Sequence, residues 1–241
     1  MRTTFKGYLR ADGRVGVRNY VAVVPTVLCS VSVARSIAEA TKTNAFPHEG
    51  GCGQVGPEKD HTLRVLQGVV SHPNIGAVLT VGLSCEQIDA KKLAEAAGDK
   101  PIRNIRIHDA GGNMKAVKKG IELVKELKME ISGAERTRID VAELTIATQC
   151  GSSDTGSGIA SNPAVGAMAD RHIEHGGAVI LGETGGLYGA AGLMARRAAT
   201  KEIGDEIRNA LQEQRSDAAR ELSTLRREQK MRGVHAALNS P

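Results

Sequence analysis

Residues 143–166 read ELTIATQCGSSDTGSGIASNPAVG, and this stretch sets the pattern on which the rest of the chain is built. Leu144 to Ala147 is short, apolar and β-branched, which is typical of a buried strand. The glycines and serines that follow cannot fill a core, but they offer backbone N–H groups and hydroxyls to a ligand. Asn162 has the character of a helix N-cap, with Pro163 at the first helical position. The stretch therefore predicts a strand, a ligand-binding turn and a helix.

A cysteine follows the predicted strand, and the same arrangement recurs earlier in the chain. Three cysteines share this place: Cys29 after the apolar run 19–27, Cys85 after the run 76–83, and Cys150 after the strand at 144–148. In an open α/β sheet the carboxyl ends of parallel strands form the edge where ligands bind. For any one of these turns, a small buried cysteine in an ordinary strand-to-helix connection is the plain alternative. The recurrence favours a functional edge.

Strand and helix patterns alternate along the whole chain, which predicts an α/β fold with parallel sheets covered by helices. We expect two Rossmann-like halves, 1–131 and 143–241, separated by the polar, turn-like residues 132–142. The first half begins with an Arg- and Gly-rich arm. The second half ends in a helical segment that runs from 191 to 237 with little interruption.

The composition is that of a soluble globular protein. Of the 241 residues, 41% are hydrophobic and 24% are charged, and the net charge of +5 is dispersed. With three Tyr, two Phe and no Trp, the chain lacks the aromatics of a base-stacking nucleic-acid platform. It shows no signal peptide and no apolar run of membrane-spanning length, so we expect a cytoplasmic protein without nucleic-acid or membrane partners. Its four cysteines are then expected to be reduced, which favours metal binding or catalysis over disulfides.

The N-terminal arm carries three arginines, Arg10, Arg14 and Arg18, among glycines. Such a segment is either a plain surface arm or a loop that brings guanidinium groups to a carboxylate. Both interpretations stay open at this point.

The loop at 45–56, AFPHEGGCGQVG, holds His48 and Cys52 four residues apart. This pair suits metal ligation, although such a pair can also be incidental. The glycines of the loop satisfy G-x-G-x-x-G literally, which makes a dinucleotide site the runner-up. The strand before the loop is too short for that site and is interrupted by Pro47, and no acidic residue follows a second strand at the expected distance.

Thiolates and imidazole are ligands for iron or zinc, and a carboxylate can act as a general base. Side chains of these kinds stand near the predicted strand ends: Cys52, Cys85, Cys150, His48, Glu86, Asp154 and Glu183. They form a site only if the fold brings them together.

Six motifs in collinear order resemble one known family. They are GYLRADGRVGVRN (7–19), PTVLC (25–29), HEGGCGQ (48–54), HPNIGAVLTVGLSCE (72–86), CGSSDTGSGIASNPAVG (150–166) and AVILGET (178–184). From about residue 5 to about residue 200 the chain resembles the altronate and galactarate dehydratases, a family that also includes the large subunit of sulfolactate sulfo-lyase.

The resemblance implies an iron-dependent lyase that eliminates water from a sugar acid, such as altronate or galactarate, to give a 2-keto-3-deoxy acid. The implied metal ligands are His48, Cys52, Cys85 and Cys150, with Glu86 beside them. The implied substrate-binding residues are Arg10, Arg14, Arg18, Gln54, Ser152 and Ser153. The implied candidates for the general base are Glu86, Asp154 and Glu183. The implied cofactor is Fe²⁺, with an iron–sulfur cluster on Cys52, Cys85 and Cys150 as the alternative.

The resemblance also implies partners and alternatives. We expect a small anionic sugar-acid or sulfonate substrate, a homo-oligomer, and a separate small lid subunit in place of an N-terminal lid domain. Relatives carry acidic residues where this chain has Gly185, Gly186 and Ala191, and a longer C-terminal portion. The alternatives are therefore a sulfolactate sulfo-lyase large subunit, or a non-catalytic binding subunit of the same family.

Overall fold

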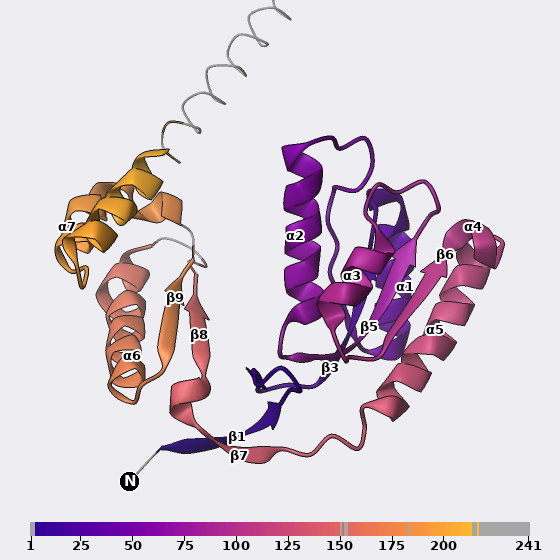
Figure 1. The fold of residues 1–241 in the computed structure, drawn as a ribbon, viewed down its shortest axis with the longest axis horizontal. Coiled ribbons are helices and arrows are strands. Elements are labelled where there is room, and N and C mark those ends of the chain that lie inside the picture. The colour runs from indigo at the N-terminus through magenta and orange to yellow at the C-terminus, as the bar shows by residue number, and fades with distance from the viewer. Residues whose placement is uncertain (1–2, 150, 152–153, 183, 214–215, 217–241) are drawn as a thin grey trace, which may run out of the picture. The chain divides into compact units, whose positions relative to one another are not determined.

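The computed structural model describes residues 3–149, 151, 154–182, 184–213 and 216. It divides the chain into two compact units, Met1–Leu144 and Thr145–Pro241. Each unit contains a parallel sheet flanked by helices (Figure 1), so the predicted α/β class is confirmed.

The first unit is built on four parallel strands in the order β4-β3-β5-β6. The strands are β3 (Tyr20–Pro25), β4 (Asn44–Ala45), β5 (Ile75–Gly82) and β6 (Ile102–Arg106). In the central pair, Val23 lies opposite Leu79, and neither side chain is exposed. Such continuous apolar runs are typical of strands that are covered on both faces.

Helices cover both faces of this sheet (Figure 1). On one face, α1 (Val31–Thr41) and α5 (Asn113–Glu130) pack on Val23 and Leu79, and on the other, α2 (Pro57–Ser71) and α3 (Ala90–Ala97) pack on Val24 and Val78. The alternation of side chains along a strand divides the apolar residues between these two cores. The turns η1 (Leu28–Ser30) and α4 (Ile107–Ala110) follow β3 and β6.

A second, antiparallel sheet corrects two predictions for the first half. The strands β1 (Thr4–Leu9), β2 (Val15–Gly16) and β7 (Thr137–Asp140) pair in the order β2-β1-β7. The prediction of an arm at 1–18 and of turn-like residues at 132–142 is therefore wrong where these strands lie. Short strands with polar alternate residues lack the apolar run by which β3 and β5 are recognised.

The second unit pairs β8 (Thr145–Thr148) with β9 (Ala178–Leu181) in parallel, and α6 (Asn162–Glu174) packs against β9. The predicted N-cap at Asn162 is wrong, because Asn162 is helical, with φ −66° and ψ −43°. The helical backbone begins at residue 155 and passes through the π-helical turn η3 (Ser157–Ser161). A π turn at this place accommodates Pro163, which has no N–H to donate to the preceding turn.

Asp154, and not Asn162, caps the start of this helix. Its Oδ1 atom accepts a hydrogen bond from the backbone N–H of Ser157 at 2.6 Å, and the Ser157 hydroxyl accepts one from the backbone N–H of Asp154 at 3.0 Å. This reciprocal arrangement is a capping box, which satisfies backbone N–H groups at the start of the helix.

The predicted uninterrupted helix at 191–237 is also corrected. After η4 (Thr184–Ala190) and α7 (Ala191–Arg196), the helical backbone breaks at residues 197–200 and resumes at 201–213. The Thr200 hydroxyl accepts a hydrogen bond from the backbone N–H of Ile203, which starts the new helix. Residues 214, 215 and 217–237 of the predicted helix lie outside the described residues.

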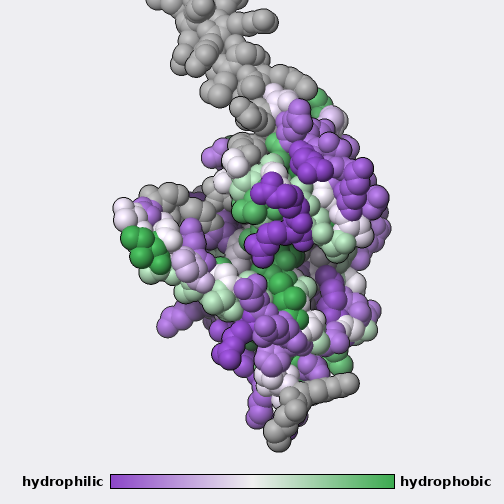
Figure 2. Space-filling view, turned by 90° about the vertical axis from the view of Figure 1, so that its left-hand side faces the viewer, coloured by the Kyte–Doolittle hydropathy of each residue, from purple (hydrophilic) through white to green (hydrophobic). Residues whose placement is uncertain are grey.

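Apolar side chains reach the surface of the second unit among polar ones (Figure 2). Ile159 is 75% exposed, and Ile173 and Ile180 are each 56% exposed. Among the described residues of this unit, Ala195 and Leu211 are the only buried hydrophobic ones. In the described part of the chain, no helix is long and apolar enough to cross a membrane.

The core of the first unit gives a test of the fold. Leu79→Ala removes a fully buried side chain at the centre of β5, so we expect it to lower the free energy of unfolding by about 2–5 kcal/mol. Leu9→Ala makes the same chemical change at a side chain that is 63% exposed, and we expect a loss below about 0.5 kcal/mol. Urea unfolding of both variants measures the difference, and equal losses would contradict the assigned core.

Candidate functional site

Three cysteine-bearing loops lie at the carboxyl edge of the four-stranded sheet. Cys29 follows β3, Cys52 lies in the connection from β4 to α2, and Cys85 follows β5. All three thiols are free and exposed. The strand order is β4-β3-β5-β6, so the chain leaves β3 towards one side of the sheet, to β4, and leaves β5 towards the other side, to β6. In open α/β sheets this reversal of strand order is the place where ligands bind.

Backbone hydrogen bonds tie the three loops together. The N–H of Leu28 donates to the carbonyl of Gly50 at 2.9 Å, and the N–H of Gln87 donates to the carbonyl of Gly51 at 3.2 Å. Gly51 has φ +90°, and a Cβ atom there would lie 2.3 Å from the carbonyl oxygen of Thr26. Only glycine allows so close an approach, so the loops form one connected layer on the edge of the sheet.

Glu86 braces the turn that carries Cys85. Its carboxylate accepts hydrogen bonds from the backbone N–H groups of Leu83 at 3.1 Å and Ser84 at 2.6 Å. Gly82 leaves room for it, since a Cβ atom at that position would lie 2.1 Å from a Glu86 carboxylate oxygen. Ser84 has φ 104°, a conformation that non-glycine residues rarely adopt. The carboxylate therefore holds a strained turn in place.

The pKa of Glu86 is lowered from its ordinary value. Burial acts to raise it, but hydrogen bonds from the backbone N–H groups of Glu86, Ser84 and Leu83, together with the charge of Arg106, outweigh burial. A general base works best with a pKa near the operating pH. Glu86 thus suits a structural role better than that of the base.

The side chains of His48 and Gln54 are occupied in holding the loop after β4. One ring nitrogen of His48, Nε2, lies 2.8 Å from the carbonyl oxygen of Pro25, and the other, Nδ1, accepts from the N–H of Gly50 at 3.1 Å. The Gln54 Oε1 atom accepts from the N–H of Gly51 at 2.8 Å. A metal ion could reach His48 only if one of its two hydrogen bonds opened.

The described side chains do not form a site for one metal ion. Within residues 3–149, 151, 154–182, 184–213 and 216, no three His, Cys, Asp or Glu side chains gather closely enough to hold one. Cys150, which the sequence places among the ligands, lies outside the described residues. The described side chains alone therefore do not make up the site of the Fe²⁺ ion that the family resemblance implies, and both the ion and the ligand roles remain predictions.

The arginines assigned to substrate lie at the opposite, amino edge of the same sheet. Arg10 donates from Nε to the carbonyl of Pro73 at 2.7 Å and from Nη1 to Oδ1 of Asn19 at 3.0 Å. Arg14 pairs with Asp12 at 2.6 Å and donates to the carbonyl of Ser71 at 2.8 Å. The structure does not bring these arginines together with the cysteine loops. Their guanidinium groups hold β1 and β2 against the start of β5.

Arg18 belongs to the same edge. Its Nη1 atom donates to the carbonyl of Val17, its nearest neighbour in the chain. The backbone N–H groups of Val17 and Arg18 both donate to the side-chain oxygen of Asn74. This segment therefore serves to attach the antiparallel sheet to the parallel one.

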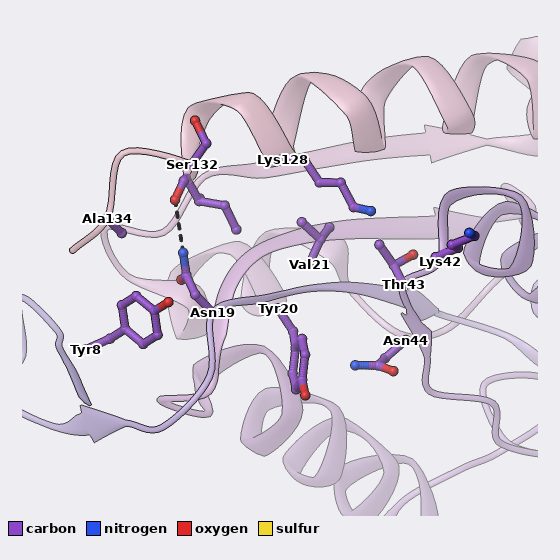
Figure 3. Close-up of a pocket in the computed structure, with 11 residues that line it drawn as sticks. Tyr8, Asn19, Tyr20, Val21, Lys42, Thr43, Asn44, Lys128, Ser132 and Ala134 are labelled. Atoms are coloured by element: carbon purple, nitrogen blue, oxygen red, sulfur yellow. Dashed lines mark hydrogen bonds between the residues drawn. The ribbon is translucent and has the colours of Figure 1, made fainter. Parts of the chain in front are cut away.

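A cavity of about 400 Å³ opens at this amino edge, where α1 and α5 end (Figure 3). Lys42 and Lys128 line it, together with Tyr8, Tyr20 and Asn44. The Lys128 ammonium donates to the carbonyl of Thr41 at 2.5 Å, so it neutralises the negative end of α1. The sequence alone does not predict this cavity, since Lys42 and Lys128 are far apart in the chain and come together only where α1 and α5 end.

Lys100 is a further cation of the amino edge. Its ammonium donates to the carbonyls of Val70 at 2.9 Å and His72 at 2.8 Å, at the end of α2. Burial, followed by the nearby charges of Arg10 and Arg14, lowers its pKa to about 8.

The second unit holds the remaining predicted residues. Asp154 caps a helix, as described above, and its carboxylate is exposed. Cys150, Ser152, Ser153 and Glu183 lie outside the described residues, so their roles remain predictions.

Comparison with known proteins gives matches over most of the chain. Residues 7–132 match the second domain of D-galactarate dehydratase/altronate hydrolase, and residues 141–236 match the C-terminal domain of D-galactarate/altronate dehydratase. The chain is 33% identical over 215 residues to an altronate dehydratase of Bacillus subtilis (strain 168), covering 85% of this chain and 43% of the relative. It is 35% identical over 201 residues to (2R)-sulfolactate sulfo-lyase subunit beta of Chromohalobacter salexigens, covering 83% and 51%.

An altronate dehydratase of Escherichia coli (strain K12) is 35% identical over 198 residues, which cover 78% of this chain and 40% of the relative. The chain thus spans about half the length of the curated relatives it matches.

The brace at Glu86 predicts a pH-dependent loss of stability. A glutamate whose pKa is lowered in the folded state stabilises the fold fully above its ordinary value of 4.5, and this contribution is lost as the pH falls through the folded-state value. We expect Glu86→Gln to be less stable than the parent chain at pH 7, with the gap closing in acid. Urea unfolding from pH 7 to pH 3 measures this, and a constant gap would contradict the brace.

A glycine pair provides the matched control for this brace. Gly82→Ala would displace the Glu86 carboxylate, so we expect it to destabilise the chain at pH 7 with Glu86 itself intact. Gly68→Ala places the same methyl group in open space on α2, where we expect no loss. The brace would be refuted if both variants unfolded at the same urea concentration.

The position of Lys100 predicts unusual reactivity towards acylating reagents. Competitive labelling with acetic anhydride as a function of pH should give Lys100 a midpoint near 8, since burial and two guanidinium groups disfavour its charged form. Arg14→Gln removes one of those charges and should move the midpoint upward. A midpoint at the ordinary 10.5 in the parent chain would contradict the assigned environment.

Proposed function

We propose, since the chain belongs to the D-galactarate/altronate dehydratase family, that it acts as a lyase that removes water from a sugar acid. The observation that supports this most is that two family domains match in order over 7–132 and 141–236. Relatives at 33% and 35% identity are named altronate dehydratases. The proposed product is a 2-keto-3-deoxy acid.

The proposed reaction sets clear demands on the site. A base takes the proton from the carbon beside the substrate carboxylate, and the hydroxyl on the next carbon leaves with a proton as water. The resulting enol then takes up a proton and becomes the keto acid. The site must therefore bind a carboxylate, hold one base with a pKa near neutrality, and deliver a proton to the leaving oxygen.

The described carboxylates make Glu183 the candidate that we favour for the base. Glu86 accepts two backbone hydrogen bonds and has a lowered pKa. Asp154 accepts the cap hydrogen bond of a helix. Glu183 follows β9 by two residues in the chain, next to the Gly-rich η4 turn, and this assignment rests on its place in the sequence.

A keto-acid assay on the full chain tests the proposed activity. Altronate, galactarate, glucarate and sulfolactate are offered separately under anaerobic conditions, with and without added ferrous iron. We expect keto-acid formation from at least one sugar acid. No turnover of any of them, in a chain that is shown to be folded, would contradict the proposal.

Two isosteric variants test the assignment of the base. We expect Glu183→Gln to lower kcat by about 100-fold or more, the usual contribution of a general base. Asp154→Asn should stay within a few-fold of the parent, because asparagine caps a helix about as well as aspartate. A large loss in Asp154→Asn with the parent melting temperature would reverse the assignment.

Sulfolactate is the second candidate substrate, because the (2R)-sulfolactate sulfo-lyase subunit beta is 35% identical to this chain, which covers 51% of its length. Release of sulfite in place of water would identify that activity. That relative is named as a subunit, so a separate small partner chain is proposed as well. A chain that binds these acids but turns none of them over would be the non-catalytic subunit.

A further inference from the structure

The cavity at the amino edge of the four-stranded sheet has no role in the proposed reaction. Its volume of about 400 Å³ is within the range of about 300–1,000 Å³ that is usual for small-molecule sites. Residues from β1, the start of β3, the loop between α1 and β4, and the end of α5 line it (Figure 3). The Cys29 loop follows the other end of β3. A ligand in this cavity would therefore occupy a site separate from the carboxyl edge.

Contacts made by two of the lining side chains hold the wall of the cavity in place. The Asn19 side-chain amide donates to the carbonyl of Ile131 at 3.0 Å, which joins the start of β3 to the residue after α5. The guanidinium carbons of Arg10 and Arg136 lie 5.5 Å and 5.2 Å from the centre of the Tyr8 ring. At these distances a guanidinium group attracts the face of the ring. The fold itself therefore forms the wall, before any ligand binds.

Three further side chains of the cavity are free to bind a ligand. Within the part of the chain that the structure describes, the Lys42 ammonium, the Asn44 amide and the Tyr20 hydroxyl make no hydrogen bond or ion pair. All three residues are exposed. An ammonium donates hydrogen bonds, whereas an amide and a phenol hydroxyl both donate and accept them. The cavity thus combines a fixed wall with unpaired polar groups.

The charge of the cavity favours an anion. None of the described residues that line it is acidic, and Lys42 and Lys128 contribute two positive charges. The carboxyl ends of α1 and α5 oppose them with about half a negative charge each. Glu130, at the end of α5, is already paired with Arg103. An excess of about one positive charge therefore remains for a ligand.

This excess matches one carboxylate better than the two charges of a phosphate. Phosphate is also bound preferentially by guanidinium forks, and no arginine is among the described lining residues. Most of the lining side chains can form hydrogen bonds, and the aliphatic ones are Val21, Ile131 and Ala134. An apolar ligand would leave the polar groups unpaired, which costs binding free energy. The lining therefore suits a small acid that carries hydroxyl groups.

We propose that this cavity binds a small polyhydroxy monocarboxylate. Lys42 recognises the carboxylate, and Asn44 and Tyr20 bind hydroxyl groups. The inference goes beyond the proposed function and does not rest on it, because binding at the amino edge requires no reaction at the carboxyl edge.

Isothermal titration calorimetry on the full chain tests the proposal with four probes. Gluconate carries a carboxylate and a chain of hydroxyls, glucose carries hydroxyls without a charge, acetate carries a charge without hydroxyls, and inorganic phosphate carries the higher charge. We expect gluconate to bind at least about tenfold more tightly than any of the others, because hydrogen bonds to charged groups and to hydroxyls add up only there. No gluconate binding, or tighter binding of acetate or phosphate, would overturn the proposal.

A matched pair of lysine variants locates the site. Lys42→Gln removes the charge that recognises the carboxylate, so we expect gluconate to bind about tenfold more weakly. Lys119→Gln makes the same change at an exposed position of α5 outside the lining, and should keep the parent affinity. Parent affinity in Lys42→Gln would place the bound gluconate elsewhere, for example at the carboxyl edge. Equal losses in both variants would indicate a general attraction of anions, and either result would overturn the proposal.

Two further variants separate a lost ligand contact from a lost fold. Lys42 has φ 50°, a conformation that glycine adopts without steric cost, so Lys42→Gly should keep the parent melting temperature. We expect it to lose gluconate affinity as Lys42→Gln does. Asn44→Ala should weaken gluconate several-fold and leave acetate unchanged, because the amide serves the hydroxyls. Parent affinity for gluconate in the folded Lys42→Gly variant would overturn the proposal.

Discussion

The pairing of β3 with β5 is the constraint on which the rest of the first unit depends. Both strands are apolar along nearly their whole length, so they must be covered on two faces, and α1, α5, α2 and α3 provide that cover. Val23 opposite Leu79 fixes the register. The same register sets the two strand ends level, so that the loops bearing Cys29 and Cys85 start side by side. The chemistry of the edge is thus a consequence of how the core is buried.

The two edges of this sheet have opposite characters. At the carboxyl edge, glycines allow loops to lie on one another, and backbone groups and the Glu86 carboxylate hold the turns. At the amino edge, Arg10, Arg14 and Lys100 donate to carbonyls at the ends of helices and strands. At the amino edge, positively charged side chains donate hydrogen bonds to backbone carbonyls. At the carboxyl edge, the exposed thiols remain available to a ligand. This division explains why arginines near the start of the chain need not belong to the site.

The sequence predicts the buried elements well and the exposed ones poorly. The strands β3 and β5 and the helices α2 and α5 follow from apolar runs and helical periodicity, because burial demands those patterns. The strands β1, β2 and β7 do not follow from the sequence, since strands of two to six residues with polar neighbours carry no such pattern. The shift of the cap from Asn162 to Asp154 depends on a π turn that no local propensity encodes. The sequence predicts that cysteines follow strands, but not that the arginines lie at the other edge or that Glu86 is a brace.

The central claim is that three loops far apart in the sequence present their thiols on one surface. A short thiol-to-thiol cross-linker, applied to the reduced chain at high dilution and followed by peptide mapping, measures this directly. The account predicts intramolecular cross-links that join Cys52 to both Cys29 and Cys85, with a yield independent of protein concentration. Cross-links that form only between chains, and vanish on dilution, would contradict it.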